Sequence, residues 1–361
     1  MSKPKRVILH VGMLKTGTTS LQIFLCDNNE ALAAQRITYF IPKHQKYNSF
    51  SNAGFLCWSS LYTARGTAPQ DLIYEKDEAL FSEFAKEYDT LILSEEFISE
   101  MGAEVPGYWE VLKSNLLRLL GNDIIVDVVI FLRRQDDWVF SRWKQQVLNS
   151  FFHENTVPTS IPDFMEFLTT ARAKGLMDYD IALERIAEVF GREHVIICVH
   201  DRKDGSSNDV VNAFLNATNI SLHNTNYNSL RANPSITMRT TKALLQISQR
   251  KRIDVSRRRI YNTAKVFSQL YPDEQNYYPM SRKDRIQLLS EFELSNEKVS
   301  NLYNNGEPLF HMEVPDYCEW RDKPDQSVQD ASLLLKLATV SSKTSNLLLK
   351  EVQQSNKNTS S

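Results

Sequence analysis

The stretch that decides the fold runs from Ile8 to Leu21 and reads Ile-Leu-His-Val-Gly-Met-Leu-Lys-Thr-Gly-Thr-Thr-Ser-Leu. Its apolar start predicts a buried strand, and its hydroxyl-rich end predicts the first turn of an amphipathic helix. Between them lies a tight glycine-bounded loop (residues 12–17), in which two glycines let the backbone approach a ligand closely. Because the first N–H groups of a helix have no intrahelical partners, this loop is predicted to bind a phosphate or sulfate group.

The side chains of the glycine-bounded loop support the same prediction. Lys15 supplies a positive charge, and four hydroxyl residues accompany it: Thr16, Thr18, Thr19 and Ser20. A strand-to-helix turn with capping hydroxyls is the alternative, but it does not need this many polar groups. The spacing resembles the nucleotide-binding loop GxxxxGK[ST] as far as Gly17, and then Thr18 stands where that loop has its lysine. A grip on Mg²⁺ and a nucleoside triphosphate is therefore not expected.

The composition of the whole chain is that of a soluble globular protein. Of its 361 residues, 42% are hydrophobic and 24% are charged, which disfavours a disordered, fibrous or membrane-embedded chain. The formal net charge of -2 argues against a surface that binds nucleic acid broadly, so any anion site must be local. The cysteines lack CxxC spacing, which indicates neither a zinc site nor a disulfide framework and is typical of a reducing cytoplasm.

No segment predicts a passage across a membrane. The apolar run of residues 7–11 is too short for a signal peptide, and no stretch approaches roughly 18 consecutive apolar residues. We therefore expect a cytoplasmic protein. Two leucine triplets, at 333–335 and 347–349, make the tail a candidate for weak self-association or for contact with a membrane surface. A marginal helix packed on its own domain is the alternative.

Short apolar runs alternate with longer helical patterns up to about residue 205. This alternation predicts an α/β protein with a three-layer P-loop-like fold, in which helices cover both faces of a central, mostly parallel sheet. The strands are expected at residues 6–11, 37–41, 90–93, 124–132 and 195–199. The helices are expected at residues 18–33, 79–88, 109–120, 137–149, 161–173 and 179–190.

After about residue 205 the pattern becomes helical, which predicts three parts. Residues 1–205 form the α/β core with the glycine-bounded loop, 206–319 form a helical C-terminal lobe, and 320–361 form a partly disordered tail. Within the lobe, residues 250–259 read RKRIDVSRRR and carry six basic residues against one acidic residue. This basic run is either a solvated helix face or a surface for an anionic oligosaccharide or for phosphates.

A lysine before the second glycine, followed by Gly-Thr-Thr, resembles the 5′-phosphosulfate loop of sulfotransferases that use 3′-phosphoadenosine 5′-phosphosulfate (PAPS). The phrase HVGxxKTGTTSLQ, from His10 to Gln22, is similar to that of bacterial members related to carbohydrate sulfotransferases. The resemblance covers about residues 5–311. It implies PAPS as the sulfuryl donor, 3′-phosphoadenosine 5′-phosphate (PAP) as the product, no required metal and a carbohydrate hydroxyl as the acceptor. It also implies that these residues bind the nucleotide: Lys15, Thr16, Gly17, Thr18, Thr19 and Ser20.

The same resemblance implies a second anion site for the 3′-phosphate, with an arginine at the end of a later strand and a serine eight positions on. Residues 128–141 read VVIFLRRQDDWVFS, which places Arg133 and Ser141 at this spacing. A guanidinium can bind two phosphate oxygens, and a hydroxyl can donate to a third. The alternative for Arg133 is a salt bridge with Asp136 or Asp137.

Sulfuryl transfer needs in-line positioning and stabilisation of charge on the leaving side. We expect Lys15 to stabilise the charge on the departing 5′-phosphate. The acceptor hydroxyl benefits from a general base, and Glu95 or Glu96 is well placed because both follow the third predicted strand. A capping or solvated acidic pair is the alternative. Relatives often carry a histidine before the next apolar helix, but this chain has Asn52 there and His44 earlier, which argues against a histidine base.

Two other functions are compatible with such a loop. One is a P-loop kinase of small molecules or sugars, which Thr18 argues against. The other is a module that binds PAPS or PAP without transferring the sulfuryl group. We expect the acceptor to be a polysaccharide, an oligosaccharide, a glycolipid or another hydroxyl compound, and we expect no nucleic-acid partner.

Overall fold

The chain folds into two compact units, each of which combines segments that are far apart in the sequence. The computed structural model describes residues 6–39, 51–67, 78–79, 81–82, 85–152, 161–200, 208–222, 235–250, 253–273, 277–311, 313–314, 318–319 and 324–339. The first unit consists of Met1–Gln135, Ala171–Ala232 and Glu291–Met312. The second unit consists of Asp136–Thr170, Asn233–Ser290 and Glu313–Ser361.

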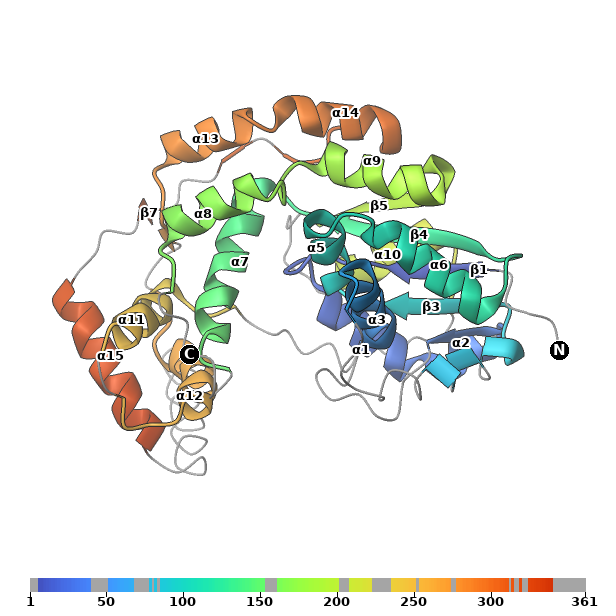
Figure 1. The fold of residues 1–361 in the computed structure, drawn as a ribbon. Helices are drawn as coiled ribbons and strands as arrows, with labels where there is room; N and C mark the ends of the chain where they lie inside the picture. The colour runs from blue at the N-terminus through green and yellow to red at the C-terminus, as the bar shows by residue number, and fades with distance from the viewer. Residues whose placement is uncertain are drawn as a thin grey trace, which may run out of the picture. The chain divides into compact units, whose positions relative to one another are not determined.

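The first unit is built on a parallel sheet of five strands in the order β2-β3-β1-β4-β5 (Figure 1). The strands are β1 (Arg6–His10), β2 (Ile37–Tyr39), β3 (Thr90–Ser94), β4 (Ile125–Leu132) and β5 (Val195–Val199). All five predicted strands are confirmed, because buried runs of apolar residues flanked by polar turns define a strand locally.

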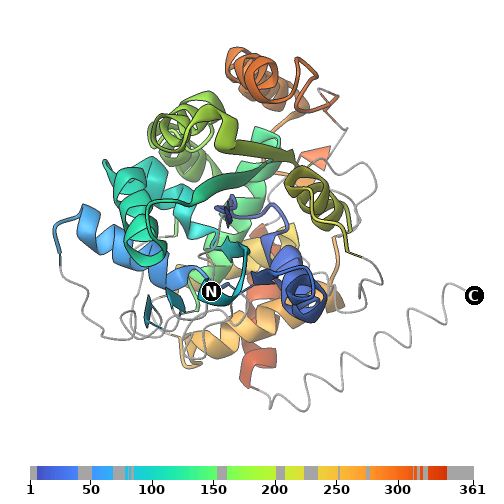
Figure 2. The same ribbon diagram turned by 90° about the vertical axis from the view of Figure 1, so that its right-hand side faces the viewer.

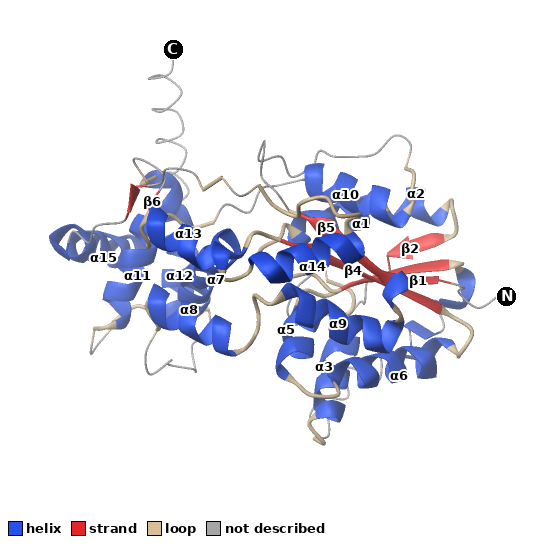
Figure 3. Cartoon of the chain, turned by 90° about the horizontal axis from the view of Figure 1, so that it is seen from above, coloured by secondary structure: helices blue, strands red, loops and turns tan. Residues whose placement is uncertain are grey.

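Helices cover both faces of this sheet (Figure 3). One face carries α1 (Thr18–Asp27), α2 (Asn29–Ala33) and α10 (Asn208–Thr218). The other carries α3 (Gly54–Ala64), α5 (Phe97–Glu104), α6 (Tyr108–Leu120) and α9 (Tyr179–Phe190), and α14 (Glu293–Tyr303) packs on α9. Two short 3-10 helices, Ala85–Glu87 and Arg192–His194, precede β3 and β5. The predicted three-layer α/β architecture is therefore confirmed.

The helix predicted at residues 18–33 is two helices. Asn28 separates α1 from α2, and its side-chain amide donates to the carbonyl oxygen of Phe24 at 2.9 Å. An asparagine side chain that bonds to the backbone competes with the hydrogen bonds of the helix, and this explains the break at Asn28. Neither α3 nor α5 corresponds to a predicted helix.

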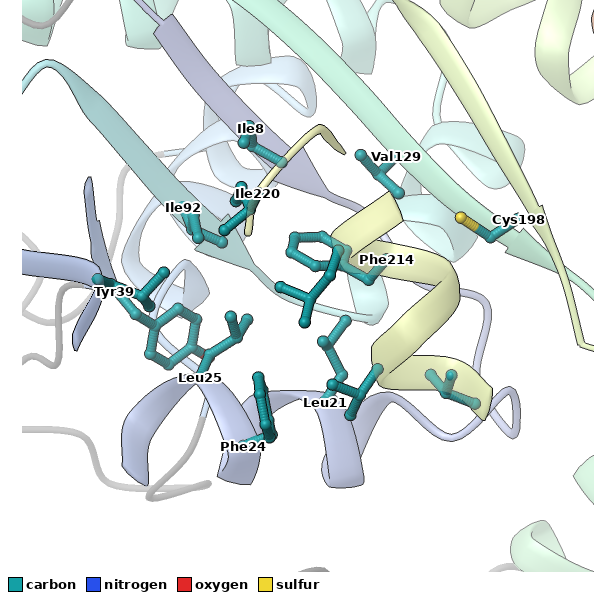
Figure 4. Close-up of a cluster of buried hydrophobic side chains, with 14 of the residues drawn as sticks. Ile8, Leu21, Phe24, Leu25, Tyr39, Ile92, Val129, Cys198, Phe214 and Ile220 are labelled. Carbon is teal, nitrogen blue, oxygen red and sulfur yellow. The ribbon is translucent and has the colours of Figure 1, made fainter. Parts of the chain in front are cut away.

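A buried cluster fixes the start of α1 against the sheet (Figure 4). Leu21 and Leu25 lie one turn apart on α1, and together with Phe24 they pack below the strand residue Ile8. Phe214 of α10 completes the cluster, and α10 lies beside α1 (Figure 2). Burying each such side chain contributes about 1.5–3 kcal/mol to folding. The first turn of α1 is thus held in a defined position at the end of β1.

The second unit is mainly helical. It contains most of α7 (Gln135–Asn149) and α8 (Phe164–Ala173), then α11 (Met238–Ser248), α12 (Arg257–Leu270), α13 (Arg282–Ser290) and α15 (Pro324–Thr339). A short parallel pair joins β6 (Tyr277–Tyr278) to β7 (Cys318–Glu319).

The units do not divide at residue 205, where the sequence predicted a boundary. Aromatic packing explains the difference, because Phe140 and Trp143 of α7 contact Phe164 of α8, and Phe140 lies 4.7 Å from the Tyr278 ring. These contacts join α7 and α8 to the later helices. A helical lobe is present, but it begins earlier in the sequence and excludes residues 291–312.

The tail carries a helix that packs on its own unit. Helix α15 lies against α11 and α12 (Figure 1), and Arg239 of α11 forms an ion pair with Asp330 at 2.7 Å. Leu334, the middle residue of the first leucine triplet, is buried. This supports the packed helix over a free amphipathic one, and the second triplet lies outside the described residues. None of the described helices has the length and apolar character that a membrane crossing requires.

Candidate active site

The candidate site lies where the carboxyl ends of β1, β3 and β4 meet. On β1, His10 is paired in register with Ser94 of β3 and with Val129 of β4. The N–H of Glu95 donates to the carbonyl of His10 at 3.1 Å, and Arg133 directly follows β4. Connections from β1 and β3 leave toward opposite sides of the sheet, and open α/β sheets bind ligands at such a switch point. The sheet therefore brings Glu95 and Arg133 to either side of the glycine-bounded loop.

The glycine-bounded loop holds three residues in the left-handed backbone region: Gly12 at φ 67°, Lys15 at φ 72° and Gly17 at φ 86°. Glycine is required at position 12 for a second reason, because a Cβ there would lie 2.8 Å from the Cα and Cβ of Glu96. Lys15 has a Cβ, so this conformation is strained by about 1–2 kcal/mol. Strain of this kind persists only where the surroundings hold it, and it is concentrated at functional sites.

The start of α1 offers hydrogen-bond donors to a group that is rich in acceptors. Its N-cap residue is Gly17, which offers no side-chain cap, and its first turn holds no acidic residue. The Thr18 hydroxyl is buried and has no hydrogen-bond partner within the described part of the chain. An oxyanion at this position would satisfy both the hydroxyl and the N–H groups of the first turn. Thr19 and Ser20, also on that turn, are half-buried.

Thr16 differs from the other hydroxyl residues of the loop. It is buried, and its hydroxyl donates to the carbonyl of Met13 at 2.6 Å. The hydroxyl hydrogen is therefore engaged within the loop, so Thr16 shapes the backbone. Among the predicted anion-binding side chains, Thr18 has the clearest geometric case.

Arg133 approaches the loop from the end of β4. Its side chain is buried, and its Nη1 donates to the carbonyl oxygen of Lys15 at 2.9 Å. Its own carbonyl accepts a 2.5 Å hydrogen bond from the Tyr179 hydroxyl. Asp136, considered above as a salt-bridge partner of Arg133, is ion-paired with Arg285 at 2.6 Å.

Ser141 is buried on α7. Because α7 begins at Gln135, Ser141 lies on its second turn. The division between the two compact units falls after Gln135, so Arg133 belongs to the first unit and Ser141 to the second.

The two glutamates that follow β3 have different environments. Glu95 is buried, and burial raises the pKa of its carboxyl group. Its Oε2 lies 2.5 Å from the Ser51 hydroxyl, and its Oε1 accepts from the N–H of Phe97. Glu96 is half-buried, and its backbone lies against Gly12 of the loop. The Cα and Cβ of Glu96 therefore border the loop, whereas the Glu95 carboxyl group is buried in the protein.

The Ser51 hydroxyl has two acceptors within hydrogen-bond distance, one of which is Glu95 Oε2. The Ser51 hydroxyl also lies 3.0 Å from the carbonyl oxygen of Ser94, and a serine has a single hydroxyl hydrogen. When Ser51 donates to that carbonyl, the short contact to Glu95 requires a proton on the carboxyl group. The raised pKa of Glu95 favours the same protonated form.

A buried polar network that the sequence analysis missed underlies the loop. The Oγ of Ser94 lies 2.8 Å from His10 Nδ1 and accepts from the Gln22 amide at 3.1 Å. Asn52 bridges the backbone of Ser94 and Ile92 at 2.7 and 2.8 Å. We call these residues the Ser94 cluster: His10, Gln22, Ser51, Asn52, Ser94 and Glu95. His10 and Gln22 are the two ends of the family-like phrase, which is the one signal that pointed to them.

Among the described residues of the site, His10 is only a weak base. Burial lowers the pKa of His10 to about 3, so its imidazole is neutral, and its Nε2 has no hydrogen-bond partner in the described residues. Asn52 is a buried structural residue, and His44 lies outside the described residues.

The last three residues of the predicted basic run form the first turn of α12, which begins at Arg257. Arg258 lies 4.0 Å from the ring of Phe152, and Arg257 donates to the carbonyl of Ser150 at 3.2 Å. The first turn of α12 has no acidic residue, and residues 251–252 lie outside the description. The arginines thus pack on aromatic rings of their own unit, and their role stays a prediction.

A surface hollow of about 600 Å³ lies between α6 and α9, with Lys113, Arg118 and Glu188 on its walls. Arg118 and Glu188 lie in the last turns of helices that lead toward β4 and β5, at the opposite end of the strands from the loop. In the described part of the chain, no group of three metal-ligating side chains comes together.

Three comparisons place the chain among known proteins. No family model matches it. It is 26% identical over 196 residues to an uncharacterized protein of Archaeoglobus fulgidus, which covers 54% of this chain and 49% of that one, so the chain spans about half the length of this relative. Among solved structures, it is similar to a sulfotransferase from Alicyclobacillus acidocaldarius, with a TM-score of 0.39 and 18% identity over 72% of this chain and 95% of that one.

Proposed function

We propose that the protein is a sulfotransferase that moves the sulfuryl group of PAPS to a hydroxyl group of a carbohydrate acceptor. The observation that carries the proposal is the start of α1. There the helix end has no side-chain cap, the buried Thr18 hydroxyl has no hydrogen-bond partner in the described residues, and Lys15 of the loop contributes a positive charge. This set of groups fits the oxygens of a 5′-phosphosulfate. It does not include the lysine after Gly17 that a kinase would use.

Each group of the site has a role in the proposed reaction. Lys15 and the N–H groups of α1 stabilise the charge that develops as the sulfur–oxygen bond to the 5′-phosphate breaks. Glu96, half-buried beside Gly12, accepts the proton of the attacking hydroxyl as the new oxygen–sulfur bond forms. Arg133 binds the 3′-phosphate, and the role predicted for Ser141 stays a prediction. Thr16 shapes the loop, and Thr19 and Ser20 contribute hydroxyl groups at its rim.

Nucleotide binding tests the donor. Calorimetric titration is expected to show much tighter binding of PAP than of adenosine 5′-phosphate, by about tenfold or more, because only PAP engages Arg133 through a 3′-phosphate. The Arg133→Ala variant should lose this difference. Equal affinities of the wild type for the two nucleotides would contradict PAPS as the donor.

A transfer assay tests the reaction. Radiolabelled PAPS is supplied with polysaccharides, oligosaccharides, glycolipids and small alcohols, and labelled product is measured. Lys15→Ala should lower turnover by about 10²–10³-fold while PAP still binds, because the lost charge acts on the transition state. Glu96→Gln should lower turnover more than Glu95→Gln. Tight PAP binding with no transfer to any acceptor would instead indicate a non-catalytic module.

A further inference from the structure

Arg133 makes a contact that nucleotide recognition alone does not require. Its Nη1 donates to the backbone carbonyl of Lys15 at 2.9 Å, although the two residues are 118 positions apart in the sequence. A charged donor to a carbonyl is among the stronger hydrogen bonds, and this one is shielded because the Arg133 side chain is buried. The residue proposed to bind the 3′-phosphate therefore also holds the residue proposed to stabilise the 5′ leaving group.

The carbonyl that Arg133 holds belongs to the strained residue of the loop. Lys15 has a φ of 72°, which residues with a Cβ adopt only when their surroundings impose it. The neighbouring Thr16 hydroxyl fixes the other side of the turn through Met13. The backbone angles of Lys15 set the direction of its side chain. The hydrogen bond from Arg133 to the Lys15 carbonyl therefore helps to determine the position of the ammonium group.

Arg133 is itself firmly anchored. The N–H of His200 donates to the carbonyl of the preceding residue Leu132 at 2.7 Å, and the Tyr179 hydroxyl donates to the carbonyl of Arg133 at 2.5 Å. A guanidinium has several N–H donors in a planar fork, so a bond to Lys15 is compatible with binding phosphate oxygens at the same time. Arg133 thus connects the edge of the sheet to the loop.

We infer that Arg133 couples recognition of the donor's 3′-phosphate to the conformation of Lys15, so that the 3′-phosphate increases the turnover rate as well as the affinity. The inference rests on the proposed function. Binding energy from a remote part of a substrate raises turnover when it fixes a group at the reacting centre. Arg133 is a positioning residue for Lys15 in this sense, and donor discrimination appears in kcat.

Hydrogen exchange on the nucleotide-free protein tests the first half of the inference. Amides of residues 12–18 should exchange about tenfold faster in Arg133→Ala and in Arg133→Lys than in the wild type, because the loop loses its anchor. Arg134→Ala is the matched control, since Arg134 donates to the carbonyl of His311 and leaves the loop bond in place. Unchanged exchange in both Arg133 variants would overturn the inference, whatever the protein's activity is.

Steady-state kinetics with two donors test the second half. With PAPS, the wild type should turn over at least about tenfold faster than with adenosine 5′-phosphosulfate, which lacks the 3′-phosphate. Arg133→Lys keeps the charge but not the fork, so the ratio of the two kcat values should fall toward one while the thermal midpoint stays the same. A wild-type difference confined to KM would overturn the coupling and leave the proposed function intact. If neither donor supports transfer, the proposed function fails, and the exchange result alone decides whether Arg133 positions the loop.

Discussion

Each compact unit contains a buried polar cluster with a carboxyl group, and the two carboxyl groups have different kinds of partner. In the first unit, Glu95 of the Ser94 cluster is held by a hydroxyl and a main-chain N–H. In the second unit, Asp136 is held by a charge, because both Nε and Nη2 of Arg285 donate to it and the ion pair closes at 2.6 Å. Tyr278 completes this Asp136 cluster, with its ring 4.1 Å from the guanidinium and its hydroxyl donating to the Asp136 carbonyl.

The two clusters differ in charge. The Asp136 cluster contains a buried ion pair, whereas burial favours the neutral forms of Glu95 and His10 in the Ser94 cluster. Asp136 and Arg285 are both almost fully buried, at 0% and 1% exposed, so each charge depends on the other and the pair fixes α13 to the start of α7. Burial raises the pKa of Glu95 and lowers the pKa of His10 to about 3, so it favours the neutral form of both groups. The Ser94 cluster therefore supports the loop without placing a fixed charge beneath it.

The largest effect is expected from breaking the Asp136 cluster. Arg285→Ala leaves the buried charge of Asp136 without its partner, which should destabilise the protein by about 3–5 kcal/mol in chemical denaturation. The control is Arg172→Ala, which removes the exposed ion pair with Glu291 and should cost less than about 1 kcal/mol. Similar losses for the two variants would contradict the importance of burial.

A methyl group at Gly12 tests the packing of the loop beside the Ser94 cluster. In Gly12→Ala, alanine would have to adopt a left-handed backbone conformation, and its Cβ would lie 2.8 Å from Glu96. We therefore expect the free energy of unfolding to fall by about 3 kcal/mol in thermal or chemical denaturation. Gly66 is a matched control, because its φ is 66° and no atom lies within 4 Å of a Cβ placed there. Gly66→Ala should cost only about 1 kcal/mol, and equal losses would show that the loop is not closely packed.

His10 should make stability rise with pH in the acidic range. The unfolded state binds a proton below the usual value of 6.5, whereas the folded state stays neutral down to about 3, so stability is lost as the pH falls between these values. In His10→Asn the slope of unfolding free energy against pH, measured between about pH 4 and 6, should fall by about 1.4 kcal/mol per pH unit. A slope equal to that of the wild type would mean that His10 is protonated in the fold.

Glu95 should give the smallest effect and the opposite sign. Its folded pKa is raised, so above the usual value of 4.5 the unfolded state releases a proton that the folded state keeps, and stability falls as the pH rises. Glu95→Gln removes this loss and should be more stable than the wild type by about 1 kcal/mol near pH 8, with no gain near pH 4. Glu96→Gln, at a half-buried position, should change stability by less than about 0.5 kcal/mol at either pH.

The sequence predicted the strands and the loop well because the evidence for them is local. An apolar run from Val7 to Val11, two glycines and a hydroxyl-rich helix start follow one another in the chain, and each acts within a few residues. The apolar runs also predicted that Arg133 and Glu95 follow strand ends, which parallel pairing brings to one edge of the sheet. It failed at the boundary between the units, because the packing of Phe140 on Tyr278 depends on partners distant in the chain.

The sequence by itself therefore determined the parallel α/β architecture and the chemistry gathered after β1. Only the tertiary structure decided which groups meet: Arg133 with the Lys15 carbonyl, Ser51 with Glu95, and Arg285 with Asp136, at separations of 118, 44 and 149 residues. Hydrogen-bond patterns within a strand or a turn are fixed by neighbours along the chain. Side chains this far apart find one another only when the sheet and the helices have set the positions of their backbones, and no periodicity in the sequence records those partners.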